Sequence, residues 1–392
     1  MTEASAPLSP YRRVRADPAD WFDVEEIARG RAYVRPIRRV LHVQTALTTT
    51  IAVAFVVGEA GPRLVEGLDV SGWVLQLVVV AAAFFAVDLG VTAWFDGWRE
   101  LVWDKRWDMS TQTVRGFLAD QVKGVAVNVG VTLLLLIPLW ALIRATDWWW
   151  LYGWLLLAGF ALLAATLGPV VIAPIFNKYT PMEDEVLRDV LLDVARIAEL
   201  DVNEVLVADA SRRSRAINAH VSGLGKTRRV VVFDTLLDWD PAHLEQIVGH
   251  ELGHWRFKHV RRRVPVLVAA QGLALVVAAA AFEWDWLLET AGVSGIREPA
   301  ALPLFLLVFQ VGFLLSTLVT SWLSRADERA ADLYALDLLG DPDAFTGAFR
   351  RLAEVNNAEV DPPLWKRLTH THPPIAERVA MAAAWRSRTL SR

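Results

Sequence analysis

The chain has no cysteine among its 392 residues, and this absence limits the metal sites and cross-links that it can form. Disulfides and thiolate ligands are excluded, so any metal ion must be held by histidine and carboxylate side chains. The chain also lacks a basic excess: its formal net charge is −4, which gives no reason to expect nucleic acid as a partner. A secretory signal peptide is not expected, because about forty mostly polar residues precede the first apolar block.

Hydrophobic residues, by contrast, are abundant. They make up 54% of the chain and lie in long blocks, which favours a lipid bilayer over one large soluble core. A helix needs about 20 residues to cross a bilayer. We therefore predict six transmembrane helices, of which the first is the least apolar because it contains several threonines. They cover about 42–57, 72–95, 125–143, 148–176, 264–282 and 302–323.

Basic residues are concentrated in alternate connections between these blocks. They are frequent before the first block and between the second and third, whereas 59–71 and 283–301 carry only Arg63 and Arg297. The positive-inside rule then places both termini in the cytoplasm. The domain plan that follows is a cytoplasmic N-terminal segment 1–40, four membrane helices over 41–176, a cytoplasmic catalytic insert 177–263, a membrane hairpin 264–323 and a catalytic C-terminal segment 324–392.

The polar insert has secondary-structure signals of its own. Apolar residues recur at helical spacing over 183–200, and short β-type runs follow at 202–209 and 229–233. A further helix is predicted over 244–259. The insert therefore reads as a small α/β domain between the fourth and fifth spans, in a chain that is otherwise mainly α.

A histidine pair with an adjacent glutamate lies in the last of these predicted helices. His250 and His254 are four residues apart, so both rings can face one ion from the same side of a helix. Glu251 lies beside that face, where its carboxylate can take a proton from water activated by zinc. The alternative is a pair of idle surface histidines. The apolar neighbours Val248 and Leu252 argue against it, because they predict a buried helix in which unused ionisable groups are costly.

A catalytic zinc ion usually has three protein ligands and one open position. His259 is out of register for the metzincin-type spacing, so the third ligand must come from elsewhere. Glu328 and Asp332 are four apart on another predicted helix: Glu328 would bind the metal, and Asp332 would accept the second ring N–H of a ligand histidine. From spacing alone, a solvated helix with Glu328 paired to Arg325 or Arg329 is equally compatible.

The C-terminal segment contains a second histidine-rich stretch. His372 and Arg378, if close to the metal, could stabilise the oxyanion of a tetrahedral intermediate. By itself this stretch is weak evidence for such a role.

The ordered motifs together resemble the integral-membrane zinc proteases of the type-1 CAAX prenyl protease family, from about residue 21 to residue 384. The resemblance implies one zinc ion on His250, His254 and Glu328, with Glu251 as the base, in a helical barrel around a water-filled chamber. Eukaryotic members have seven spans and six are counted here, so a fully closed chamber does not follow. The motifs that carry the resemblance are 110–113, 175–181, 211–214, 218–225, 233–237, the HELGHW helix, the ExxxD segment and 372–374.

The stretch 218–223 is a candidate for holding substrate, because a protease can add an extended peptide as a strand to a sheet edge. In the family it resembles the edge strand beside the metal helix; without the resemblance, a plain loop would be slightly favoured. The candidate substrate-binding residues are Asn218, Ala219, Val221 and Gly223.

Three functions compete. The first is hydrolysis near the C-terminus of CAAX-type or other membrane-associated proteins, whether prenylated or not. The second is general quality control of membrane proteins, as in the related heat-shock membrane protease. A non-catalytic channel or scaffold is disfavoured, because base, ligands and supporting acid are all present. The composition is typical of a bacterial cell membrane protein, and most bacteria lack protein prenylation, which favours the second function in the cell.

Overall fold

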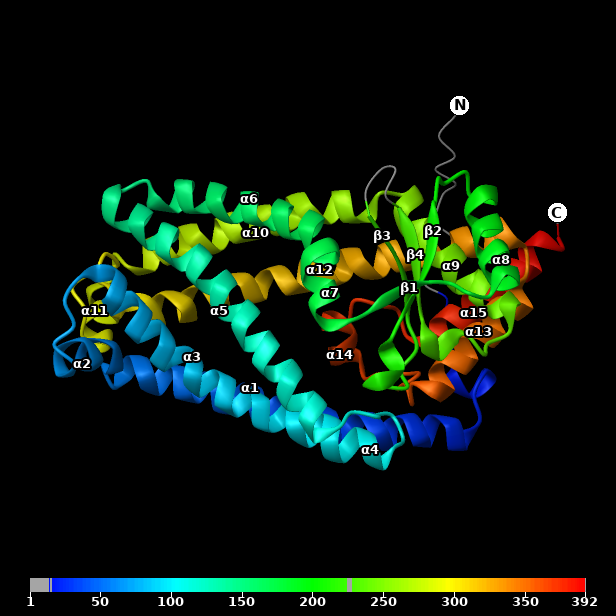
Figure 1. Cartoon of the computed structure of the whole chain (residues 1–392), viewed down its shortest axis with the longest axis horizontal. Coiled ribbons are helices and arrows are strands. Elements are labelled where there is room, and N and C mark those ends of the chain that lie inside the picture. Colours follow the sequence, from blue (N-terminus) through cyan, green and yellow to red (C-terminus); the bar gives the residue numbers. More distant parts are fainter. Residues whose placement is uncertain (1–13, 15, 224–227, 392) are drawn as a thin grey trace.

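The computed structural model describes residues 14, 16–223 and 228–391, and its long helices run along the longest axis of the molecule (Figure 1). In this described part, six helices are long and apolar enough to cross a membrane, which confirms the predicted number. They are α1 (Val24–Val57), α3 (Trp73–Trp98), α5 (Val114–Ala145), α6 (Trp149–Leu167), α10 (His259–Ala281) and α12 (Leu302–Leu339).

Two of these helices extend well beyond their apolar blocks. α1 begins at Val24, because Asp23 caps it: the Asp23 carboxylate accepts from Glu26 N at 2.7 Å, and the Glu26 carboxylate accepts from Asp23 N at 2.9 Å. α12 continues to Leu339 without a break. The boundaries drawn at residues 40 and 323 therefore mark changes in hydrophobicity within continuous helices.

Short helical elements continue or connect the remaining spans. After α3 the chain continues through a π-helical turn (Arg99–Trp103) and α4 (Asp104–Arg106), and after α6 through a second π-helical turn (Gly168–Ile172) and α7 (Ala173–Phe176). At the opposite end of the molecule, α2 (Ala60–Gly67), α11 (Asp285–Ala291) and a 3-10 turn (Pro299–Ala301) make the connections (Figure 1).

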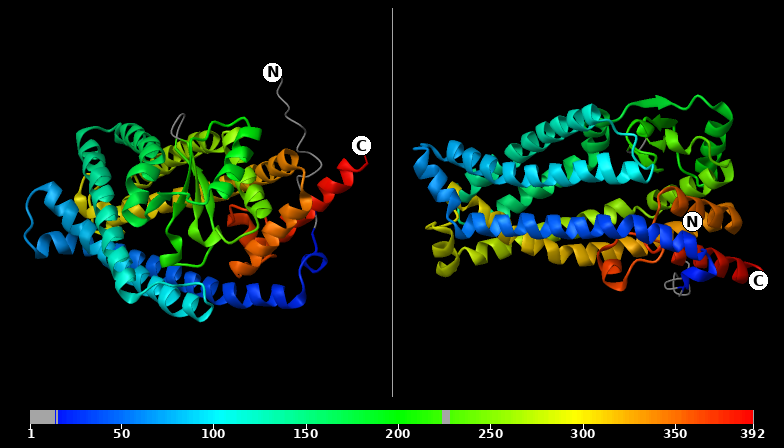
Figure 2. Two further views of the ribbon diagram at one scale, coloured as in Figure 1. Left: turned by 45° about the vertical axis from the view of Figure 1, so that its right-hand side comes forward. Right: turned by 90° about the horizontal axis from the view of Figure 1, so that it is seen from below.

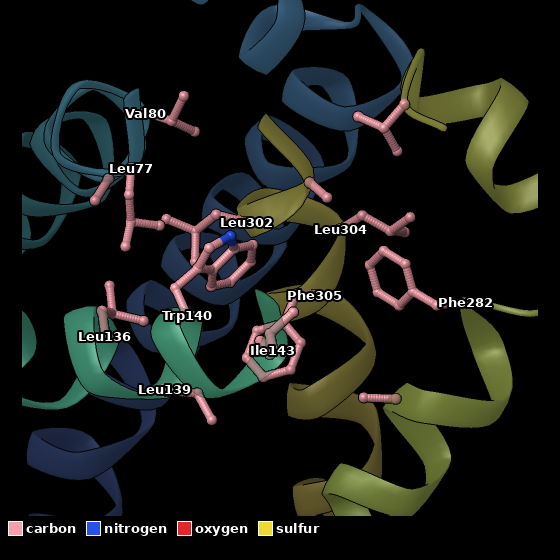
Figure 3. Packing of buried hydrophobic residues seen from close by; sticks show 14 of the residues in the cluster. Leu77, Val80, Leu136, Leu139, Trp140, Ile143, Phe282, Leu302, Leu304 and Phe305 are labelled. Carbon is pink, nitrogen blue, oxygen red and sulfur yellow. The ribbon is translucent and has the colours of Figure 1, made fainter. Parts of the chain in front are cut away.

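Large apolar side chains pack the spans together at this opposite end (Figure 3). Trp140 of α5 is fully buried, and its ring meets Phe305 of α12 edge-on at 5.8 Å between centroids. Leu77 of α3 and Phe282, directly after α10, belong to the same cluster. Four spans are thus fixed to one another far from the polar insert, and the enclosed chamber implied by the resemblance stays a prediction.

The insert forms a four-stranded sheet of order β1-β2-β4-β3. β1 (Tyr179–Pro181) is antiparallel to β2 (Glu204–Ala208), β2 is parallel to β4 (Arg229–Phe233), and β3 (Ala219–Ser222) pairs antiparallel with β4. β3 is therefore an edge strand. Helices α8 (Glu185–Ile197) and α9 (Pro241–Arg256) share an apolar core with the sheet.

The helix predicted over 244–259 is wrong at its C-terminal end. α9 stops at Arg256, and His259 is the first residue of α10. Lys258 lies between them in the left-handed conformation, with φ of 55°, and this separates two helices that the apolar spacing joined.

The C-terminal helices α13 (Pro342–Val355), α14 (Leu364–Thr369) and α15 (Ile375–Thr389) follow α12. α13 and α15 pack against the last turns of α12 through an apolar cluster that includes Leu336, Phe345 and Val379. The start of α1 lies at the same end of the molecule (Figure 2). The sheet, α9 and the described chain ends are thus gathered on one side of the membrane helices.

Candidate active site

Helix α9 places His250, Glu251 and His254 beside α12. Its N-terminus is fixed by Asp240, whose carboxylate accepts from Ala242 N at 2.9 Å. Gly253 lets the two helices approach closely: a Cβ added there would lie 3.0 Å from Ala331 Cα, on α12. This close contact brings the preceding turn of α12, which carries Glu328, to the histidine face of α9.

Three ligand atoms converge between the two helices. The Nε2 atoms of His250 and His254 lie 3.2 Å apart. The Glu328 carboxylate lies 3.3 Å from the first and 3.4 Å from the second. A tetrahedral zinc ion with bonds of roughly 2.0–2.1 Å would set its ligand atoms about 3.3 Å apart. The three side chains therefore form a group that fits such an ion.

Glu328 is only 3% exposed, and its Oε2 atom has no hydrogen-bond partner within the described part of the chain. The alternative pairings with arginine are not formed: Arg325 donates to His370 O at 2.6 Å, and Arg329 donates to Glu377 at 2.6 Å. A buried carboxylate oxygen without a donor, facing two ring nitrogens, is the arrangement expected where a cation binds.

His250 is held from behind by Asp332, one helical turn after Glu328. Asp332 is fully buried, and its carboxylate lies 2.8 Å from His250 Nδ1. Burial by itself would lower the pKa of His250, but the Asp332 carboxylate outweighs it and raises this pKa to about 9. Nδ1 is thus bound to Asp332 while Nε2 faces Glu328 and His254, as required of a ligand histidine.

Arg378 supports Asp332 rather than standing free in the site. Its Nε donates to Asp332 at 2.8 Å, and Nη2 also contacts this carboxylate and lies 3.2 Å from His250 Nδ1. The guanidinium packs over the Phe349 ring at 3.8 Å from its centroid. Sequence reasoning placed Arg378 at the oxyanion; these contacts favour a role in holding Asp332.

His254 has a support of its own, which sequence reasoning missed. Its Nδ1 lies 2.9 Å from Nδ1 of His259, whose Nε2 lies 3.6 Å from Asp327. Arg263 donates to Asp327 at 2.8 Å and lies 3.9 Å from Glu328. The spacing of His259 in the sequence bears only on metal binding, and the left-handed residue Lys258, which turns α10 against α9, has no clear signal in the sequence.

Glu251 faces a cavity of about 320 Å³, which is also lined by His372, Arg378, Asn218 and Ala219. Burial raises the pKa of Glu251. None of the described residues donates a hydrogen bond to its carboxylate, which leaves it available for a proton. His372 lies at the mouth of the site: its side chain is 61% exposed, and Nε2 is 3.4 Å from Glu328.

The edge strand β3 runs beside this cavity. Phe233 N donates to Asn218 O at 3.0 Å, so alternation in the antiparallel pair points the N–H groups of Ala219 and Val221 away from β4. Val221 O accepts from the Trp255 indole at 3.3 Å, which ties the strand to α9. Gly223, with φ of 91°, ends the strand, and Gly225 lies outside the described residues.

Family models match nearly the whole chain. Residues 181–386 match peptidase family M48, and residues 10–178 match the N-terminal part of CAAX prenyl protease, with five membrane helices. The chain belongs to peptidase family M48. It is therefore a multi-pass membrane metallopeptidase with an HExxH helix and a distant glutamate, and the predicted family is confirmed.

Relatives of this M48 peptidase are found in bacteria and eukaryotes. It is 29% identical over 391 residues to the metalloprotease YhfN of Bacillus subtilis, covering 96% of this chain and 90% of that protein. It is 26% identical to the CAAX prenyl protease 1 homolog of Caenorhabditis elegans, covering 71% and 70%. The crystal structure of S. mikatae Ste24p matches with a TM-score of 0.81 at 21% identity, over 93% of this chain and 90% of that one, which confirms the fold.

Proposed function

We propose that this M48 peptidase is a zinc-dependent endopeptidase that cleaves membrane-associated proteins near the membrane surface. The proposal is supported above all by the convergence of His250, His254 and Glu328 at 3.2–3.4 Å between two helices. When bound there, zinc would act as a Lewis acid that lowers the pKa of the attacking water toward 7 and polarises the substrate carbonyl.

The surrounding side chains have separate tasks in this proposal. Glu251, which faces the cavity, takes the proton of the attacking water and returns it to the leaving amine. Asp332 keeps the Nδ1 proton of His250 in place, and Arg378 keeps Asp332 charged and oriented. His372, close to Glu328 and largely exposed, donates to the developing oxyanion.

The substrate is held in extended form along the free edge of β3. The outward N–H groups of Ala219 and Val221 are donors for a peptide strand, and Ala219 lines the cavity next to Glu251. Main-chain bonds carry no side-chain information, so recognition along this edge is broad. The site, the sheet and the described chain ends share one end of the molecule, and the positive-inside rule assigns that end to the cytoplasm.

For the substrate class, we propose CAAX-type or other membrane-associated C-terminal segments. Several relatives are named as CAAX prenyl protease 1 homologs, while the similar metalloprotease YhfN is a bacterial protein. The second candidate, quality control of membrane proteins, is favoured by the broad main-chain recognition at β3.

One experiment separates these possibilities. The purified protein in lipid vesicles is given a CAAX-ending peptide with and without a farnesyl group, and an unfolded membrane protein, with Glu251→Gln as the inactive control. Cleavage that needs zinc and Glu251 supports the peptidase, and the preferred substrate identifies its class. Absence of zinc-dependent cleavage of all three would contradict the proposal.

A further inference from the structure

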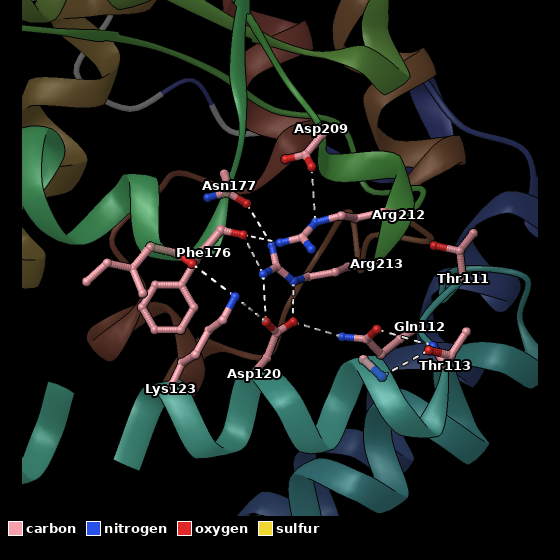
Figure 4. Close-up of polar contacts among 12 residues, drawn as sticks. Thr111, Gln112, Thr113, Asp120, Lys123, Phe176, Asn177, Asp209, Arg212 and Arg213 are labelled. Atoms are coloured by element: carbon pink, nitrogen blue, oxygen red, sulfur yellow. Dashed lines mark hydrogen bonds and ion pairs between the residues drawn. The ribbon is translucent and has the colours of Figure 1, made fainter. Parts of the chain in front are cut away.

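A polar cluster outside the active site joins the catalytic insert to the membrane helix α5 and to the short helix α7 (Figure 4). Its centre is Arg213, in the loop between β2 and β3. The guanidinium donates to both carboxylate oxygens of Asp120 on α5, at 2.6 and 3.0 Å. It also donates to the Asn177 side chain at 2.7 Å and to Phe176 O, at the end of α7, at 2.5 Å. One side chain thus connects the loop to α5 and to the C-terminal end of α7.

The partners of Arg213 are themselves fixed. Asp120 accepts a further bond from Gln112 at 3.2 Å, and Lys123 donates to Ile175 O at 3.2 Å. A fork of N–H donors facing a carboxylate with two parallel bonds sets position and orientation together, which a single lysine ammonium cannot do.

Backbone bonds extend the same contact. Thr111 N donates to Arg213 O at 3.0 Å, and Arg215 N donates to Met109 O at 2.9 Å. The loop before β3 is therefore paired with the segment that leads into α5, and it cannot shift along the sheet without breaking this pairing.

The loop leads directly to the site. Ile217, Asn218 and Ala219 line the cavity that Glu251 faces. Between Arg213 and these residues, Ala216 O accepts from Thr235 at 3.0 Å. The chain from the cluster to the cavity is short and bonded along its length, so the position of Arg213 determines where the edge strand begins.

We propose that Arg213 is a positioning residue for the substrate: by binding Asp120 and the end of α7, it fixes the edge strand β3 relative to the metal helix α9. This inference rests on the proposed function, in which β3 holds the peptide. The ion pair is partly exposed, at 22% for Arg213 and 21% for Asp120, so its contribution to overall stability is small. Its effect on peptide binding is larger, because a displaced edge strand presents its N–H groups to the peptide at poor angles, and a hydrogen bond weakens steeply as it bends.

The test uses Arg213→Lys, which keeps the charge and loses the fork, and Asp120→Asn, which keeps the shape and loses the charge. The matched control is Arg196→Lys, in an exposed pair with Asp193 on α8 of the same insert. The full-length protein is assayed with a decapeptide ending in a CAAX sequence, farnesylated or not. The dissociation constant of the fluorescein-labelled peptide is measured in the Glu251→Gln background.

Both cluster variants should raise KM and the dissociation constant by about tenfold, which is the net contribution of about one main-chain hydrogen bond. The kcat should stay within about twofold of the wild type, with zinc content and Tm unchanged. The Arg196→Lys protein should match the wild type in every measurement. Unchanged KM and dissociation constant in both cluster variants would overturn the proposal. So would a loss of activity that follows zinc loss or a lower Tm, because it would make the cluster merely structural. A wild-type protein without zinc-dependent cleavage would instead contradict the proposed function, whatever the variants do.

Discussion

Two glutamates of the site differ in what surrounds them, although they lie close together. Glu328 is buried between the ring nitrogens of His250 and His254. Glu251 faces the cavity and accepts no hydrogen bond from the described residues. A carboxylate surrounded by nitrogens suits a cation, and a carboxylate facing the cavity suits a proton. Zinc binding and catalysis should therefore be separable by mutation.

Glu251→Gln should retain zinc and lose turnover by about a hundredfold to ten-thousandfold, the usual contribution of a general base. Glu328→Ala should lose the zinc as well, because only two protein ligands remain. Atomic absorption on the purified proteins measures the metal, and peptide cleavage measures turnover. A Glu328→Ala protein with its full zinc content would remove Glu328 from the ligand set.

His372 and Arg378 should give different results, although both line the cavity. His372→Ala should keep zinc and lower kcat by about a hundredfold, as for the loss of one oxyanion donor. Arg378→Lys should weaken zinc binding, by something like tenfold, because Asp332 loses its fork of donors and His250 is held less firmly. Zinc affinity by competition with a chelator and kcat on one substrate measure the two effects. Equal zinc affinity in Arg378→Lys and wild type would return Arg378 to the oxyanion role.

Secondary-structure elements differ in how far the sequence specifies them. β4 has the predicted bounds, because four consecutive strand-type residues after Arg229 are a strong local signal. β1 was not predicted as a strand: it has three residues, ends in proline and exists only through pairing with β2. The end of α9 was placed too late because nothing local marks Lys258 as left-handed.

The same distinction applies to the site. The register of His250, Glu251 and His254 follows from helix geometry alone. The contact of Glu328 with them depends on Gly253 packing against Ala331, which no periodicity reveals, and it was favoured only through the family resemblance. Contacts such as Arg378 with Asp332 join residues far apart in the sequence, so spacing could not supply them.

The edge strand β3 provides a test at the level of the element. Val221→Pro removes an outward N–H without removing any bond to β4, so the sheet should survive. Pro181 already occupies an outward-facing position at the other edge, in β1. Val221→Pro and Ala219→Pro should therefore raise KM while zinc content and Tm stay near those of the wild type.

The control for the proline variants is Val221→Ala, which loses the side chain but keeps the N–H group. It should cleave nearly as well as the wild type. Normal KM in both proline variants would mean that the peptide is held elsewhere.

At the scale of the whole molecule, the structure places the sheet, the metal helix and the described chain ends at one end of the spans, with α2 and α11 at the other. The six candidate spans of the described residues are an even number, so they would put both described chain ends on the same side of a bilayer. The positive-inside rule, applied to the distribution of arginine and lysine, predicts that this side is the cytoplasm.

A reporter that fluoresces only in the cytoplasm should therefore light up when fused to either terminus. The same reporter inserted into the α2–α3 connection, 68–72, should stay dark. Activity of each fusion protein shows that the chain is folded. A dark C-terminal fusion in an active protein would place the site on the opposite side of the membrane.

Helix α12 is one continuous helix from the apolar cluster at Leu302 to the residues around Glu328. At about 1.5 Å per residue, these two positions are separated by roughly 39 Å, so a change in the tilt of α12 about its end at Leu302 is amplified at the candidate metal site. A change of tilt by about 3° would displace Glu328 by roughly 2 Å over that length.

Long helices meet a thinner bilayer by tilting. The activity of the peptidase should therefore depend on membrane thickness. In vesicles of shorter-chain lipids, kcat should differ several-fold from kcat in vesicles of longer-chain lipids. The same preparations assayed in detergent, where no bilayer imposes a thickness, should all have the same kcat. Equal kcat across lipids of different chain length would show that the packing of α9 against α12 absorbs the tilt before it reaches His250, His254 and Glu328.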